Sequence, residues 1–137
     1  MQQQLALVLT VLLVLPLSQC SLQSYKVTGI LKCGSSPAAD VRVRLVDDET
    51  FGDRDLDETK TASDGRFSLS GKAKEISSLD PRLKINHKCN TSKLRICDRK
   101  WTFKLPEEYI NKGTFDIGTW NLELLIKKDE GTDCFRR

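Results

Sequence analysis

The sequence is built from short segments in which inward and outward positions alternate, and this pattern limits the fold more than any single motif. Tyr25, Val27, Leu31 and Cys33, for example, fall on one side of a period of two, which is typical of a half-buried strand. No stretch of useful length shows the period of an amphipathic helix. The alternation therefore predicts an all-β fold.

Six further segments are predicted to be strands, and turn residues such as Asp64-Gly65 separate them. They cover residues 41–46, 58–61, 66–70, 82–89, 100–105 and 115–126. Residues 106–110 fit one helical turn with Pro106 at its first position. About seven strands at roughly ten-residue spacing, without crossover helices, predict an antiparallel sandwich of two sheets.

The amino-terminal residues have the features of a secretory signal. A run of about a dozen mostly apolar residues at positions 5–17 precedes small residues and a cleavage point after Cys20. The run is shorter than the roughly 20 residues that span a bilayer, and no later stretch comes closer. We therefore expect a signal peptide at 1–20, one secreted, extracellular domain at 21–137, and no transmembrane segment. The alternative is a buried N-terminal strand.

Four cysteines, Cys33, Cys89, Cys97 and Cys134, remain once Cys20 leaves with the signal. An even number in an exported chain indicates two disulfide bonds. Zinc fits poorly, because the spacing offers no compact ligand pair and the chain has one histidine, so we expect no metal and no cofactor. Of three possible pairings we predict Cys89 with Cys97, which closes a short turn, and Cys33 with Cys134, which ties the first strand to the tail.

Two further candidate positions flank Cys89. Asn90 begins the sequence Asn-Thr-Ser, an acceptor for an N-linked glycan, and both a used and an unused site remain open. His87 falls on the apolar side of its segment. A neutral, hydrogen-bonded core histidine is therefore the favoured interpretation over a ligand or a pH switch.

Acidic residues are concentrated at 47–58, where seven carboxylates accompany a single cation, Arg54. The spacing Asp-x-Asp-x-Asp that starts at Asp53 resembles the beginning of a calcium-binding loop. Its sixth position is Glu58, however, where the sharp turn of such a loop needs glycine. We interpret the segment as a solvated acidic loop and not as a calcium site.

A string of motifs runs in order through nearly the whole chain after residue 20. They are residues 27–33 (VTGILKC), 37–45 (PAADVRVRL), 57–71 (DETKTASDGRFSLSG), Asp80-Pro81, Cys89 with Cys97, Pro106 with Tyr109, and 115–122 (FDIGTWNL). Together they resemble the nematode transthyretin-like family of secreted proteins. The resemblance implies a transthyretin-type sandwich and an extracellular binding or adaptor module. Ligands of this family are mostly unsettled, with lipid or cell-surface binding proposed for some members.

The resemblance also raises an enzyme alternative, because the wider fold includes hydrolases of 5-hydroxyisourate. That chemistry needs clustered histidine and arginine and a Tyr-Arg-Gly-Ser end, whereas His87 is alone here and the chain ends in DCFRR. We expect neither enzymatic activity nor a nucleic-acid partner. A carrier of a small hydrophobic ligand, held between the sheets or in an oligomer, is the first alternative to a binding module. The oligomeric state stays open.

Cations are expected to share one face, because a transthyretin-type strand order makes the second, fifth and sixth predicted strands neighbours. Such a face would attract anionic phospholipid surfaces or sulfated glycans, with about 1 kcal/mol per Lys or Arg at an anionic surface. Salt would weaken the attraction. The alternative is an ordinary solvated sheet. The residues are Arg42, Arg44, Arg82, Lys84, Lys88, Lys100 and Lys104.

Overall fold

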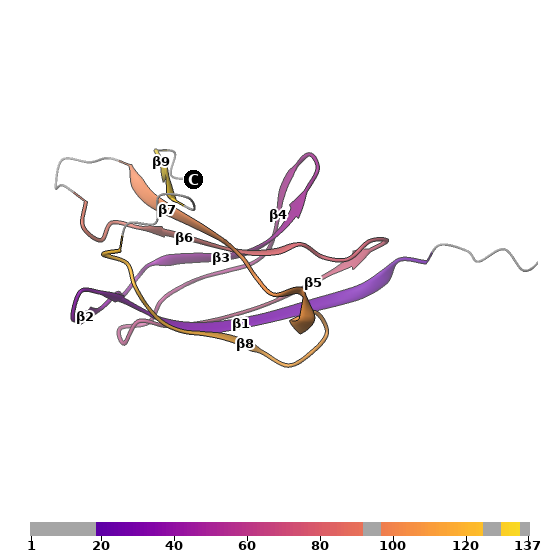
Figure 1. Cartoon of the computed structure of the whole chain (residues 1–137), viewed down its shortest axis with the longest axis horizontal. Helices are drawn as coiled ribbons and strands as arrows, with labels where there is room; N and C mark the ends of the chain where they lie inside the picture. Colours follow the sequence, from indigo (N-terminus) through magenta and orange to yellow (C-terminus); the bar gives the residue numbers. More distant parts are fainter. Residues whose placement is uncertain (1–18, 92–96, 125–129, 135–137) are drawn as a thin grey trace, which may run out of the picture.

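The computed structural model describes residues 19–91, 97–124 and 130–134. Within them two β-sheets form the two layers of a sandwich (Figure 1), which confirms the predicted fold class. The 3₁₀ turn η1 (Glu107–Tyr109) lies where one helical turn was expected. No helix in these ranges is long and apolar enough to cross a membrane. The expected signal peptide lies almost wholly outside the described residues and stays a prediction.

The first sheet, sheet A, is organised around β1 (Ser21–Cys33). β5 (Arg66–Glu75) pairs antiparallel with most of β1, and β2 (Ser36–Pro37) folds back on its end. β8 (Phe115–Asn121) pairs with β1 in parallel, in contrast to the expected purely antiparallel arrangement. Gly29 on β1 leaves room for the Ile117 side chain of β8, because a Cβ at position 29 would lie 2.3 Å from Ile117 Cγ1.

The second sheet, sheet B, has the order β4 (Gly52–Lys60), β3 (Arg42–Glu49), β6 (Pro81–His87), β7 (Asp98–Lys104) and β9 (Glu130–Asp133), all antiparallel. The expectation of an acidic loop at 47–58 is wrong. These residues complete the β3–β4 hairpin, because carboxylates on β4 face cations across the sheet and so tolerate a strand. β9 was not predicted.

The last predicted strand is too long. β8 ends at Asn121, and a turn follows in which the Asn121 carboxamide oxygen accepts the backbone N–H groups of Gly34 and Glu123, both at 3.0 Å. Leu122 is buried as expected, but Leu124 is exposed. Residues 125–126 of the prediction lie outside the described residues. An asparagine that satisfies two amides thus stops the strand where hydrophobic alternation alone would continue it.

The core lies between the sheets and consists of the inward positions that the alternation predicted. Trp101 occupies its centre, with edge-on contacts to His87 and Phe103 at centroid distances of 5.2 and 5.7 Å. The Tyr25 hydroxyl donates to the Pro106 carbonyl at 2.8 Å, and burial raises the pKa of Tyr25 to about 12. Other buried members are Val27, Leu31, Val43, Leu45, Phe67, Leu69, Leu83, Ile85, Leu105 and Leu122.

The predicted disulfide pairing is wrong. Cys33 bonds to Cys89, and Cys97 bonds to Cys134. The first bridge joins the end of β1 in sheet A to Cys89, two residues after the end of β6 in sheet B, with a Cα–Cα distance of 5.7 Å. The second follows from the β7–β9 register, because pairing of Asp98 with Asp133 places the neighbouring cysteines opposite each other.

Candidate functional site

The seven predicted cations do gather on the outer face of sheet B. Arg44 lies opposite Lys84 on the neighbouring strand, and Arg82 lies opposite Lys104. Arg42 and Lys100 both face Asn86 across the sheet. Lys88 follows the end of β6 directly. The strand order that the resemblance implied therefore brings these side chains together as expected.

Carboxylates, however, neutralise most of the positive charge on this face. Six of the seven cations have an ion pair among the described residues, and Lys100 is the exception. Three of the partners come from β4, which sequence reasoning had treated mainly as a loop. The pairs are Arg42 with Glu58, Arg44 with Asp55, Arg82 with Asp48, Lys84 with Asp53, Lys88 with Asp98 and Lys104 with Glu107.

The pKa values of several groups on this face are shifted by the neighbouring charges and by burial. The hydrogen bond between Arg42 and Glu58 raises the pKa of the guanidinium and lowers the pKa of the carboxyl. Burial, followed by the charges of Lys100 and Arg44, lowers the pKa of Lys84 even though its ammonium contacts Asp53. The face is thus a ladder of mixed charge, in which an arriving anion must compete with carboxylates already in place.

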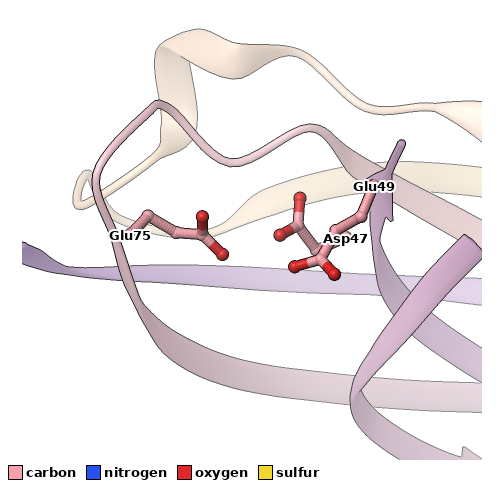
Figure 2. Close-up of side chains that lie close together, drawn as sticks. All are labelled: Asp47, Glu49 and Glu75. Atoms are coloured by element: carbon pink, nitrogen blue, oxygen red, sulfur yellow. The ribbon is translucent and has the colours of Figure 1, made fainter. Parts of the chain in front are cut away.

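A second cluster joins the two sheets at one end of the sandwich. The carboxylates of Asp47, Glu49 and Glu75 point toward one another, with one oxygen of each within 4.8 Å of the others (Figure 2). Arg54 contacts all three, at 3.1 Å from Asp47 and 3.4 Å from Glu49, and pairs with Glu75 as well. Asp47 also accepts the Asp80 amide at 2.8 Å. The guanidinium supplies the positive charge that these carboxylates require, so the cluster is a structural clamp between β3, β4 and β5.

His87 is a core residue, as predicted. Its side chain is 3% exposed, and Nδ1 accepts the backbone N–H of Cys89 at 3.1 Å. Burial first, and then the positive charge of Arg99, lower the pKa of His87 to about 4, while Glu130 and Asp98 oppose the shift. The ring is therefore neutral at physiological pH.

Arg99 is the residue that sequence reasoning missed. It is 4% exposed and donates to the carbonyls of Cys89 and Leu122, each at 3.0 Å, and of Leu124 at 2.9 Å. Both carboxylate oxygens of Glu130 on β9 accept from the same guanidinium. One side chain thereby holds together β7, β9 and two turns. Its inward position in the alternation of β7, two residues before Trp101, was the available signal.

The outer face of sheet A carries cations of a different kind. Lys26 on β1 and Lys72 and Lys74 on β5 point away from the core, and the exposed Lys112 lies beside β1, where Asn111 and Ser24 exchange hydrogen bonds. These four residues are called the lysine group below. No carboxylate forms an ion pair with any of them within residues 19–91, 97–124 and 130–134.

Two surface hollows complete the description. One, of about 460 Å³, lies where the strands of sheet B begin or end and is lined by charges of both signs, among them Arg42, Glu58 and Lys88. The other, of about 650 Å³, is shallow and lies over β1, β5 and β8, with Thr28, Ser68 and other polar groups in its wall. The first hollow is mainly polar, and the second, although Ile30 and Phe67 are also in its wall, is shallow; a site for a hydrophobic ligand is concave and mainly apolar.

Comparison with known proteins supports the resemblance seen in the sequence. A sequence model described as the transthyretin-like family (TTR-52) matches residues 28–106. Transthyretin-like protein 33 of Caenorhabditis elegans is 38% identical over 84% of this chain and 84% of its own length. The chain belongs to the transthyretin-like family. Transthyretin-like protein 5 of the same organism is 40% identical over 82% of this chain and 84% of its own length.

The match to transthyretin-like protein 46 of Caenorhabditis elegans is 45% identical and covers 79% of this chain, but only 64% of that protein's length. These three relatives are all named as transthyretin-like proteins. A crystal structure of a 9R-lipoxygenase from Cyanothece aligns with 80% of this chain and 17% of its own, at 17% identity and a TM-score of 0.49.

Proposed function

We propose that this chain is a secreted, non-enzymatic binding module that recognises anionic extracellular surfaces through the outer face of sheet A. One observation carries the proposal: the lysine group has no carboxylate partner among the described residues, whereas most cations of sheet B do. An unpaired lysine attracts an anionic surface by about 1 kcal/mol. A paired one must first lose or share its partner.

The chemistry shared by anionic phospholipid headgroups and sulfated glycans is a dense array of acidic oxygens. Lysines at successive outward positions of one sheet match such an array without a deep pocket, because Lys72 and Lys74 are two residues apart on β5 and Lys26 faces Ser70 of the same strand. Secretion by residues 1–20 would bring this face to such surfaces. Asn90 is exposed in the turn after Cys89 and could accept a glycan on secretion.

The test compares two triple variants that each remove three positive charges. K26Q/K72Q/K74Q alters sheet A, and K88Q/K100Q/K104Q is the matched control on sheet B. We expect the first to weaken binding both to vesicles of phosphatidylcholine with phosphatidylserine and to immobilised heparin, and added salt to weaken it further. The control should bind almost normally. Equal loss in both variants would refute the assignment to sheet A, and no binding by the unmodified domain would refute the proposed function.

Removal of the signal peptide and glycosylation of Asn90 can be measured together. Intact-mass analysis of the protein secreted from eukaryotic cells, before and after glycosidase, reports both the amino terminus and occupancy of Asn90. A mature chain that begins at Ser21 is the expected result, and a loss of mass on deglycosylation would show that Asn90 is used. Retention of residues 1–20 would contradict the proposed secretion.

A further inference from the structure

The outer face of β1 and β5, in the lower layer of Figure 1, carries cations that are separated by hydroxyl groups. The outward side chains of the two strands lie opposite each other in pairs, because the strands are antiparallel and in register. We call these residues the sheet A strip. In order along the strands, the pairs are Leu22 with Lys74, Ser24 with Lys72, Lys26 with Ser70, Thr28 with Ser68, and Ile30 with Arg66.

Three lysines stand close together in one half of this strip. Lys72 and Lys74 are two residues apart on β5, which separates them by about 7 Å. Lys26 lies opposite Ser70 and is therefore the diagonal neighbour of Lys72, at about 7–8 Å. Arg66 marks the other end, about 26 Å from Lys74 along β5. Its pair with Asp64, at 3.3 Å, is exposed on both sides and therefore weak.

The middle of the strip is hydroxylated and open. The shallow hollow of about 650 Å³ lies there, with Thr28 and Ser68 in its wall and the half-buried Ile30 beside them. The two hydroxyls donate to no acceptor among the described residues. Space is also open at Gly118, where a Cβ would meet no atom within 4 Å. A sugar ring can therefore lie flat here, with its hydroxyls on polar groups and its C–H face on Ile30.

Carboxylates border the strip on both sides. Asp57 of β4 accepts the Ser70 amide at 2.9 Å along the outer edge of β5. Asp116 of β8 faces Thr28 from the other side of β1 and accepts the Gly118 amide at 2.9 Å. A broad anionic layer, such as a plane of phospholipid headgroups, would meet these carboxylates as well as the lysines. A single anionic chain that follows the two strands meets mainly the lysines, so the charge pattern favours a linear ligand.

We propose that the sheet A strip binds one sulfated polysaccharide chain lengthwise along β1 and β5. Sulfate groups then lie at Lys26, Lys72 and Lys74, which donate charge-assisted hydrogen bonds to them. A sugar ring occupies the hollow, and sulfates separated by neutral rings match cations separated by hydroxyls. Clustered basic residues are typical of heparin-binding surfaces. The inference rests on the proposed function and narrows it, because it selects a sulfated glycan over a phospholipid surface.

The first experiment adds one negative charge to each sheet in turn. S68E places a carboxylate in the hollow, and T102E is the matched control, since Thr102 lies opposite Lys84 on the outer face of sheet B. We expect the dissociation constant for heparin oligosaccharides to rise at least about fivefold in S68E, equivalent to about 1 kcal/mol, and to stay unchanged in T102E. Unchanged affinity in S68E, or an equal loss in T102E, would overturn the inference.

A second experiment locates the glycan on the unmodified protein. Lysines are acylated with and without bound heparin oligosaccharide, and the modified positions are identified by mass spectrometry. Lys26, Lys72 and Lys74 should be protected, whereas Lys88, Lys100 and Lys104 of sheet B should react as in the free protein. Desulfated heparin should protect none of them. Protection by desulfated heparin, or protection of sheet B alone, would overturn the inference.

Phospholipid vesicles separate this inference from the proposed function. If the unmodified protein binds vesicles of phosphatidylcholine with phosphatidylserine but not heparin, the choice of a glycan is wrong and recognition of anionic surfaces stands. Binding to neither would overturn both. Where both bind, added salt should release the vesicles first, because only the linear chain avoids the bordering carboxylates. Release of heparin at the lower salt concentration would overturn the choice of a glycan.

Discussion

Arg99 offers the sharpest test of what stabilises this fold. Its guanidinium pairs with Glu130 and donates to three backbone carbonyls in a position almost closed to water. Replacing it with methionine keeps much of the volume but removes the guanidinium that a mostly buried carboxylate and three carbonyls share. Loss of one partner of a buried ion pair costs about 3–5 kcal/mol. Against a typical domain stability of about 5–15 kcal/mol, R99M should lose at least about a fifth of the total.

The assay is urea unfolding with the disulfides intact, followed by tryptophan fluorescence. E130Q and the double variant R99M/E130Q complete a double-mutant cycle, and R99K is the conservative control because it keeps the charge without the two-pronged geometry. We expect R99M to be the least stable single variant and the double variant to recover part of the loss. A loss below about 1 kcal/mol in R99M, as for an exposed pair, would refute the reasoning.

Three further predictions concern stability. Because the pKa of His87 falls from 6.5 unfolded to about 4 folded, the unfolded chain binds more protons, and about 3 kcal/mol of stability should be lost as pH decreases through this window; a profile unchanged in H87N would contradict this. G65A should lose more than G113A by thermal unfolding, because both glycines have positive φ but only at Gly65 would a Cβ meet backbone, 2.2 Å from a carbonyl oxygen; equal losses would contradict it. Non-reducing peptide mapping should recover Cys33 joined to Cys89, and removing that bridge should cost about 4 kcal/mol by loop entropy; a Cys89–Cys97 peptide would contradict it.

The fold was predictable from sequence because alternation is a local property. A strand that buries one face must place apolar residues at every second position, so the inward positions of β1 and β6 could be read without their partners. The disulfide pairing could not be predicted in the same way, because it depends on contacts between segments far apart in the sequence. It depends on the β7–β9 register, and β9 is a four-residue strand of Glu, Gly, Thr and Asp that carries no apolar alternation.

The sequence predicted the cations on the outer face of sheet B but not the carboxylates that pair with them. Outward cations on β3, β6 and β7 were placed correctly, since their direction follows from the same alternation. Their partners were missed, because Asp53, Asp55 and Glu58 lie in a segment that reads as turn and loop. Acidic residues disfavour strands in general, and only a neighbouring basic strand reverses the preference.

The ion pairs of sheet B determine where uncompensated positive charge lies on the folded domain. The whole chain has a net charge of +3, and seven of its 19 acidic residues lie at 47–58, in the β3–β4 hairpin. Sheet B therefore neutralises itself at ion-pair distances, and the positive field that remains outside the molecule comes largely from surfaces without such partners. Sheet A is one of these. A count of lysines and arginines would rank sheet B first as an anionic-binding face, but an approaching anion responds to the uncompensated charge, and this criterion favours the lysine group.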